Sequence, residues 1–516
     1  MPAELPAARG AAGDVGLLEL SDGSLVHPDR FDDRYGRGVR APHLRSEDSR
    51  TETERDRGRL GYSSSLRRLA GVTQVVSPDL AAARMHSRES HTHKVALVAR
   101  ELAELVVRRA RTDQAVASLI HQVGGLDIAA CEAAGLAHDL GHAPFGHAGE
   151  VELHNLLLAR TDDGFEGNPQ SFRIVTRLDG RTLKRTDLDL TNVTLCAILK
   201  YPWDKEEAST DPAAPTQKVQ RPPKYGAYAE DRAKFTLVRS KVMGEGAATN
   251  RRQSLEASIM DLADDIAYAI HDLEDFCAAG MIDLYDVRLK LEDALGAVSD
   301  VHETNKFETS QSSDPFTLAT RKLRSTYDGL FDDTEFYFAV QRTRSLINQV
   351  IQRSGDEDGM PVVLRDYLSG KIGEYFSTLE ISDALPYSEA AYVRLSKASW
   401  HEVQVLKVIT RHWLIGSPQM GVIQRAQTRA IRTLFDSLVN WLESSPDAVT
   451  VPKALHEALT NAGVDLNQED VGTLDNRHYR AIGDYISGLS DSEALLRSNW
   501  FAGRDIPGMT VVAEAY

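Results

Sequence analysis

Apolar residues recur at steps of three and four near residues 91–108, at Val95, Val98, Leu102 and Leu105. An α-helix turns once every 3.6 residues, so this spacing places these side chains on one face of a helix. His91 lies four residues before Val95 and therefore shares that face. The pattern predicts a helix over residues 91–108 that carries a histidine on its buried side.

The same periodicity predicts helices over 126–141, 190–201, 252–276, 403–415 and 425–442. Pro144 disfavours helical backbone at Ala143, so we expect the chain to turn there, and Pro202 ends the helix before it. Strand patterns are few and no internal repeat is evident. The sequence therefore predicts an all-α fold.

Composition along the chain suggests three parts. Residues 1–50 are rich in Gly, Pro, Asp and Arg, which predicts a flexible arm with a short ordered piece near residues 16–26. Residues 51–280 form a predicted helical core, and its polar, proline-rich segment 203–235 is interpreted as a loop or lid. Residues 281–516 form a predicted helical C-terminal region, with loops at 302–314 and 354–360.

The net charge is −17, from 59 basic and 76 acidic residues, which argues against nucleic acid as the main partner. The three cysteines are far apart, so we expect no disulfide framework and a reducing compartment. No segment approaches the roughly 18 apolar residues of a membrane span, and no signal peptide is evident. We therefore expect a soluble, cytoplasmic protein with no membrane partner.

Residues 136–150 read LAHDLGHAPFGHAGE and carry the clearest chemistry in the chain. The adjacent His138 and Asp139 offer a nitrogen and an oxygen ligand, a combination that suits a divalent transition metal. His142, His147 and Glu150 follow within twelve residues of that pair. The alternative, core histidines beside a glycine-rich turn, explains this density of histidines poorly.

Two other segments complete a candidate metal site. His91 lies in RESHTHKV, and Asp264 or Asp265 lies in the otherwise apolar LADDIAYAI. With His138 and Asp139 they give two imidazoles and two carboxylates, which suits one Mn, Mg, Fe, Co, Ni or Zn ion. The alternative for either aspartate alone is a solvated charge on a helix.

Other residues in these segments offer further chemistry. His147 and Glu150 are three residues apart, so on a helix the carboxylate can orient the imidazole as a general acid or base. An incidental surface pair is the alternative. His142 could bind a phosphate or hold a water, or be an exposed histidine at a helix end. Asp264, Tyr268 and Asp272 are spaced by four and share a predicted helix face.

The order His, His-Asp, Asp, together with the long central motif, resembles the HD-domain deoxynucleoside triphosphate triphosphohydrolases, the dGTPase-like branch. The resemblance covers roughly residues 50–280. It includes SSLRRLAGVTQ at 64–74, ILKYP at 198–202 and ADDIAY followed by HDLED. It implies an HD-domain helical core with a helical C-terminal extension.

By this resemblance, the protein hydrolyses a dNTP to the deoxynucleoside and inorganic tripolyphosphate. The matching positions imply metal ligands at His91, His138, Asp139 and Asp264, the last because the family's ligand lies four residues before the tyrosine. His147 with Glu150 would transfer a proton near the leaving oxygen. The implied substrate contacts are phosphate binding by His142, Arg88 and Lys200, a further contact by Tyr201, and a sugar pocket of Gln74, Tyr268 and Asp272.

Two of these residues have a purely structural alternative. Gln74 could be an ordinary turn residue, and Lys200 could be a cation that is favoured at a helix C-terminus. Relatives of this kind are commonly homo-oligomers, hexamers or tetramers, and some respond to a nucleotide effector. Two alternatives for the function stay open: an HD-type phosphodiesterase or 5′-nucleotidase acting on monophosphates, and a catalytically silent nucleotide-sensing protein. The complete set of motif residues argues against the silent protein.

Overall fold

The computed structural model describes residues 7–37, 48–74, 87–180, 186–206, 224–246, 251–296, 314–327, 329–355, 359–383, 391–415, 418–444, 451–464 and 474–504. These residues divide between two compact units, and each unit draws on three stretches of the chain. Unit 1 comprises residues 1–31, 93–135 and 252–420, and unit 2 comprises 32–92, 136–251 and 421–516.

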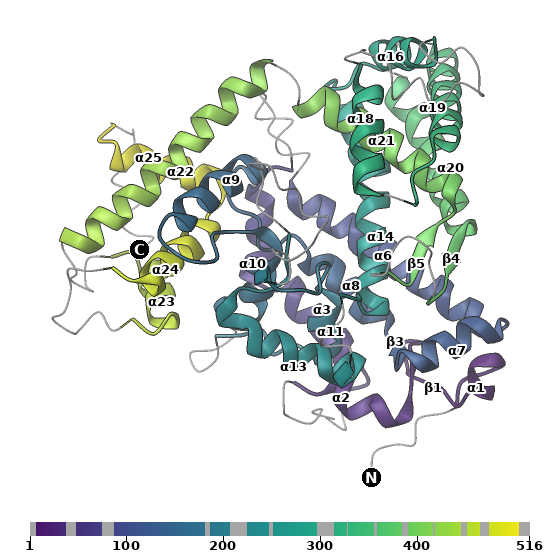
Figure 1. Cartoon of the computed structure of the whole chain (residues 1–516), viewed down its shortest axis with the longest axis horizontal. Helices are drawn as coiled ribbons and strands as arrows, with labels where there is room; N and C mark the ends of the chain where they lie inside the picture. Colours follow the sequence, from purple (N-terminus) through teal and green to yellow (C-terminus); the bar gives the residue numbers. More distant parts are fainter. Residues whose placement is uncertain are drawn as a thin grey trace. The chain divides into compact units, whose positions relative to one another are not determined.

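The described residues of unit 1 form mainly helices, with five short strands. Its elements, labelled where space allows in Figure 1, are α1 (Ala11–Asp14), β1 (Leu18–Glu19), β2 (Leu25–Val26), η1 (Pro28–Arg30), most of α6 (Arg88–Ala110), α7 (Gln114–Gln122), β3 (Gly125–Leu126), most of α8 (Ile128–Ala137), α14 (Leu255–Ala267), η6 (Tyr268–Asp272), α15 (Leu273–Ala278), α16 (Leu284–Gly296), α18 (Pro315–Thr326), α19 (Asp333–Ser354), α20 (Met360–Ser377), β4 (Leu379–Ile381), β5 (Val393–Leu395) and α21 (Lys397–Ile415).

The regular elements in the described residues of unit 2 are all helices. Its elements are most of α2 (Phe31–Tyr35), α3 (Glu52–Gly61), α4 (Ser64–Arg68), η2 (Leu69–Gly71), the first turn of α6, α9 (Gly146–Leu158), α10 (Gly167–Arg173), η3 (Ile174–Leu178), α11 (Asn192–Ala197), η4 (Ala229–Asp231), α13 (Arg232–Met243), most of α22 (Pro418–Ser444), α23 (Lys453–Asn461), α24 (Asn476–Ser487) and α25 (Asp491–Phe501).

The predicted all-α fold is confirmed, and the predicted helices over 91–108, 403–415 and 425–442 lie within α6, α21 and α22. Side-chain caps define several helix starts. Thr51 forms a capping box at α3, and Ser254 accepts a hydrogen bond from the Ala257 amide at the start of α14. Such caps satisfy amides that have no partner within the helix.

The structure departs from the sequence prediction near the N-terminus. Residues 7–37, predicted as part of a flexible arm, form α1, β1, β2, η1 and α2. Strand β2 pairs with β1 on one side and with β3 on the other, and both pairings are antiparallel. Leu25 lies opposite Leu126, a partner 101 residues away that local periodicity does not reveal. The predicted ordered piece near residues 16–26 contains both N-terminal strands.

Three other boundaries differ. The helix predicted over 126–141 is shorter, since α8 ends at Ala137. The helix predicted over 252–276 is divided into α14 and α15 by a π-helical turn, η6. Most of the predicted loop 203–235, residues 207–223, lies outside the described residues, whereas its last residues begin α13.

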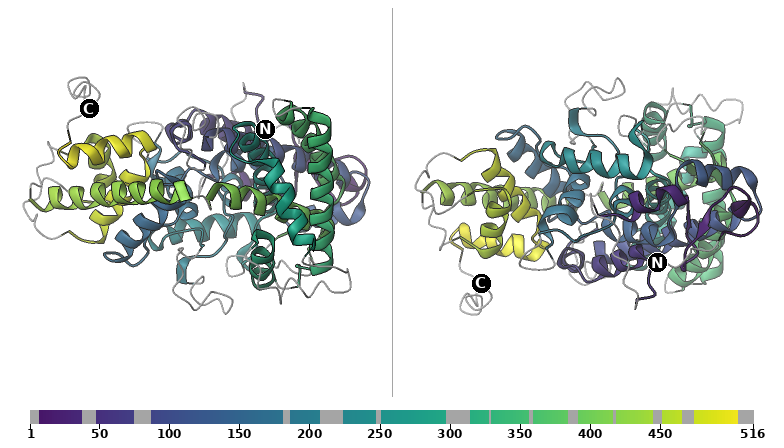
Figure 2. Two further views of the ribbon diagram at one scale, coloured as in Figure 1. Left: turned by 90° about the horizontal axis from the view of Figure 1, so that it is seen from above. Right: turned by 90° about the horizontal axis from the view of Figure 1, so that it is seen from below.

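One hydrophobic core of unit 2 joins α9 to the C-terminal helices. Its buried side chains include Leu153 and Leu157 of α9, Leu434 and Phe435 of α22, and Ile482 of α24. Both views in Figure 2 show the C-terminal helices, coloured yellow, beside α22. Core packing of this kind fixes the orientation of α9, the helix that carries part of the central motif. None of the helices in the described part of the chain has the length and apolar character that crossing a membrane requires.

Candidate active site

Two histidines of unit 2 are held close together by the ends of two helices. His91 lies in the first turn of α6, and His138 directly follows α8. Both are buried, at 3% and 7% exposure, and their ring centroids are 5.7 Å apart. Paired buried imidazoles are unusual as packing residues and suit a metal site.

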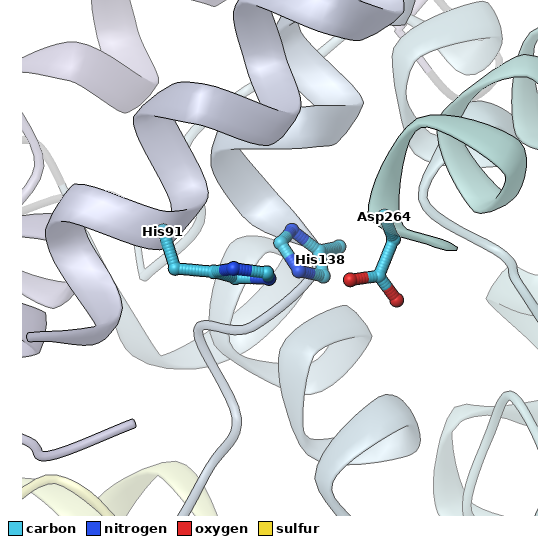
Figure 3. A group of neighbouring side chains, drawn as sticks. All are labelled: His91, His138 and Asp264. Carbon is cyan, nitrogen blue, oxygen red and sulfur yellow. The ribbon is translucent and has the colours of Figure 1, made fainter. Parts of the chain in front are cut away.

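The ligand atoms of His91, His138 and Asp264 lie within 4.8 Å of one another. Figure 3 shows the side chains of these three residues directed toward one another. The alternative carboxylate, Asp265, accepts a hydrogen bond from Nζ of Lys407 at 2.7 Å. Two nitrogens and one oxygen at this separation could hold a divalent metal ion.

Asp139 lies beside this group, but its carboxylate has protein partners. Nη1 of Arg88 donates to Oδ2 at 2.6 Å, and Nδ1 of His142 lies 3.1 Å from Oδ1. Nε2 of His138 is 3.4 Å from the same oxygen. Burial tends to raise the pKa of this carboxyl, but His142, His138 and Arg88 outweigh it and hold the pKa well below its usual range. Asp139 is therefore ionised, as a metal ligand must be.

Close backbone approach fixes the turn after this aspartate. A Cβ on Gly141 would lie 2.1 Å from the carbonyl oxygen of Gly167, so only glycine fits there. The Gly141 amide donates to Oγ of Ser171 at 2.8 Å, and this hydroxyl donates to the carbonyl of His138 at 2.9 Å. Helix α10 thereby holds the backbone on both sides of Asp139.

Helix α9 brings together the other charged residues of the central motif. Nδ1 of His147 is 3.0 Å from Oε2 of Glu150, and Nε2 of His142 is 3.4 Å from Oε1. Burial tends to raise the pKa of Glu150, but His142 and His147 outweigh it and lower the pKa. Burial, with Arg88 nearby, lowers the pKa of His142 to about 4, so this imidazole is neutral at pH 7. The side chain of His147 is 52% exposed.

Glu150 and the two histidines have a second potential use. His142, His147 and Glu150 also have ligand atoms within 4.8 Å of one another and could hold a cation.

Other predicted substrate residues of unit 2 lie on connecting segments. Gln74 follows Thr73, whose backbone forms a bridge with Ser87 just before α6. Lys200 and Tyr201 lie a few residues after α11, and the Tyr201 ring packs edge-on against Trp203 at 5.5 Å.

Tyr268 and Asp272 belong to unit 1, at the two ends of η6. Burial and the Asp272 carboxylate raise the pKa of Tyr268 to about 12, which keeps the phenol neutral. Nζ of Lys407 lies 6.0 Å from the centre of the Tyr268 ring. The π-helical turn changes the geometry assumed from a spacing of four, but the influence of Asp272 on Tyr268 indicates that the two remain neighbours.

Comparison with known proteins adds to this geometry. The model of the HD domain matches residues 88–269, and that of the phosphohydrolase-associated domain matches residues 393–499. A deoxyguanosinetriphosphate triphosphohydrolase-like protein of Bifidobacterium longum is 28% identical over 495 residues, 92% of this chain and 88% of the relative. The chain thus carries a match to the HD domain and one to the phosphohydrolase-associated domain, and it is similar to a dGTPase-like protein over most of its length.

Other relatives carry the same name. One from Streptomyces coelicolor is 39% identical over 250 residues, and this match spans 47% of the chain and about half, 51%, of the relative. One from Vibrio vulnificus is 29% identical over 474 residues, 87% of the chain and 92% of the relative. The higher identity is thus found over about half of each chain.

Sequence reasoning missed two residues that contact the motif backbone. Arg68 donates from Nη2 to the carbonyls of Leu140 and His142, at 2.6 and 3.0 Å. Asp491 accepts a hydrogen bond from the Phe145 amide at 2.7 Å. Arg68 lies in SSLRRLAGVTQ, which offered a signal, whereas Asp491 lies more than 300 residues after the motif and offered none.

Proposed function

We propose that this chain is a metal-dependent dNTP triphosphohydrolase that releases the deoxynucleoside and inorganic tripolyphosphate. The observation that carries the proposal is the buried imidazole pair of His91 and His138 together with the His147–Glu150 pair that follows His138 in the central motif. The names of the relatives support a deoxynucleoside triphosphate as the substrate class.

The donor set fits a divalent ion. His91 and His138 supply nitrogens, and Asp264 and the ionised Asp139 supply oxygens, so Mn, Mg, Fe, Co, Ni and Zn all remain candidates. When bound, such an ion supplies positive charge that stabilises the phosphate oxygens and favours ionisation of water. Arg88 positions Asp139 through its 2.6 Å hydrogen bond, as partners of metal-binding carboxylates do.

His147 is the proposed proton donor to the leaving 5′ oxygen. Its Nδ1 faces the Glu150 carboxylate, so Nδ1 carries the proton and Nε2 is the nitrogen that exchanges a proton with substrate. The buried Glu150 carboxylate accepts the Nδ1 hydrogen and so holds the imidazole in one orientation. Protonation of the 5′ oxygen makes it a better leaving group as water attacks the α-phosphorus.

Positive and polar groups are proposed to bind the triphosphate. The Arg88 guanidinium and the Lys200 ammonium supply charge, and His142 and Tyr201 supply hydrogen-bonding groups. Tyr268 is proposed to pack against C2′, where a ribose hydroxyl would clash, and Asp272 to accept a hydrogen bond from the 3′ hydroxyl. Gln74 is a further proposed contact of the sugar.

Product analysis tests this proposal. Purified protein, loaded with each metal in turn, is incubated with each dNTP separately and with all four together, and the products are resolved by anion exchange. We expect tripolyphosphate and deoxynucleoside in equal amounts from the parent chain, and none from His138→Ala. A rate that rises only in the mixture would indicate a nucleotide effector.

The same experiment distinguishes the alternatives. Hydrolysis of nucleoside monophosphates or cyclic nucleotides, without tripolyphosphate from any dNTP, would overturn the proposal in favour of a phosphodiesterase or 5′-nucleotidase. Nucleotide binding without turnover under every metal and mixture would favour a silent nucleotide-sensing protein.

A further inference from the structure

Phe145 has an unusual backbone conformation between His142 and His147. Its φ of 65° and ψ of 17° are left-handed, a region that a bulky residue rarely occupies, and Gly146 follows with φ 56°. Phe145 precedes α9 as its N-cap residue but makes no capping hydrogen bond with its side chain. Its ring is buried in the core that α9 shares with the C-terminal helices. Surrounding contacts must hold this strained conformation.

One carboxylate supplies such a contact and reaches a second segment as well. Oδ1 of Asp491 accepts from the Phe145 amide at 2.7 Å. Oδ2 accepts from the amide of Thr73 at 3.1 Å and from its hydroxyl at 2.7 Å. Thr73 directly precedes Gln74, and Phe145 lies two residues before His147. Asp491 thus joins a predicted substrate-binding segment to the segment that carries the proposed proton donor.

Arg68 makes a parallel link between the same parts of unit 2. It donates from Nη2 to the carbonyls of Leu140 and His142 and from Nη1 to the carbonyl of Leu489 at 3.1 Å. The loop of the central motif, residues 140–147, is therefore linked to residues 489–491 both through Arg68 and through Asp491. Residues 489–491 belong to the stretch matched by the phosphohydrolase-associated domain.

Capping of its own helix does not explain the placement of Asp491. Helix α25 begins at Asp491, but the hydroxyl of Ser490 caps it and Glu493 completes the capping box. The carboxylate of Asp491 instead accepts from three donors outside its helix.

We propose that Asp491 is a positioning residue of the active site, through which the C-terminal helices hold the His142–His147 loop and the Thr73–Gln74 segment in their working geometry. This inference rests on the proposed function. Asp491 acts on the reaction through the backbone of Phe145 and Thr73, so its loss misplaces His147 and Gln74 while the metal ligands keep their own supports.

Asp491→Ala and Asp491→Asn test the inference, with Ser490→Ala as the matched control. The alanine variant removes the hydrogen bonds to both Phe145 and Thr73. The asparagine variant keeps one acceptor oxygen but places an NH₂ group where the other oxygen accepts a hydrogen bond. Ser490→Ala weakens the start of the same helix but leaves both links intact. We expect kcat for the best dNTP to fall at least tenfold in both Asp491 variants, with bound metal per chain unchanged, and to stay within twofold of the parent in Ser490→Ala.

Amide hydrogen exchange gives a readout that does not depend on turnover. We expect faster exchange of residues 140–147 in Asp491→Ala and parent-like exchange there in Ser490→Ala. The inference would be overturned if both Asp491 variants kept the kcat and the amide exchange of the parent. It would also be overturned if Ser490→Ala lost as much kcat as the Asp491 variants. If the parent chain released no tripolyphosphate, the proposed function would fail, and the exchange result would still decide whether Asp491 holds the loop.

Discussion

Asp139 shows what the sequence conveys about a single residue and what it does not. Its place beside His138 predicts a metal ligand, but the pattern does not show that Arg88 donates to the same carboxylate at 2.6 Å. Arg88 is predicted from resemblance as a phosphate contact, and tertiary folding gives it this partner as well. The pairing of His147 with Glu150 was predictable, because residues three apart on a helix are neighbours.

At His91, metal binding can be separated from general effects on α6. His91→Ala removes a buried imidazole from the candidate ligand group, whereas His93→Ala changes an exposed residue half a turn away. Loss of a residue that only supports a metal ligand typically weakens metal binding by about 10–100-fold. We expect His91→Ala, which removes a ligand itself, to weaken metal binding by more than this. We expect His93→Ala to bind metal like the parent. Equal metal content of the two variants by elemental analysis would contradict the ligand assignment.

At His147, the acid–base assignment predicts a loss of rate without loss of metal. His147→Ala should lower kcat by about 10²–10⁴-fold, the usual contribution of a general acid or base. Glu150→Gln should lower kcat less, and the double variant should lose less than the product of the single losses, since both residues act through one proton transfer. His456→Ala, on α23, is the control. Parent-like turnover of His147→Ala would remove this residue from the mechanism.

At Tyr268, the sugar assignment predicts a change in specificity. Tyr268→Ala removes the ring proposed to exclude the ribose hydroxyl, so the ratio of kcat/KM for a dNTP over its ribonucleotide should fall about tenfold or more. Competition between the two nucleotides in one reaction measures this ratio directly. Unchanged discrimination would assign the exclusion of ribose to another residue.

At the scale of elements, the central motif is a tight turn between α8 and α9, held by α10. The sequence predicts the turn from Pro144, but the shorter α8 follows from contacts with residues that come later in the chain. The π-helical turn η6 was not predictable either, because the periodicity of 252–276 fits one continuous helix.

The turn makes Gly141 the most sensitive glycine of the motif. Gly141→Ala places a methyl group against the backbone of α10, so we expect a loss of about 1–3 kcal/mol or more in the free energy of unfolding. Gly58→Ala, inside α3 with open space around it, should gain about 0.5–1 kcal/mol. Chemical denaturation of the two variants measures both. The changes in the free energy of unfolding are expected to have opposite signs in the two variants. A Gly141→Ala variant as stable as the parent would mean that α10 does not approach the turn so closely.

At the scale of the whole molecule, helical periodicity was sufficient to predict the fold class. An ordered piece near residues 16–26 was predicted, but its strand pairing was not predictable, because β2 pairs with β3 from a distant part of the sequence. The ties of Arg68 and Asp491 to the motif loop are also long-range contacts and leave no local pattern. The homo-oligomer and the nucleotide effector stay predictions from the resemblance.

Hydrolysis in water enriched in ¹⁸O tests the central claim most directly. If water attacks the α-phosphorus and the 5′ oxygen leaves, mass spectrometry should find one ¹⁸O atom in each tripolyphosphate and none in the deoxynucleoside. Release of a nucleoside monophosphate with pyrophosphate, or ¹⁸O in the deoxynucleoside, would contradict the account.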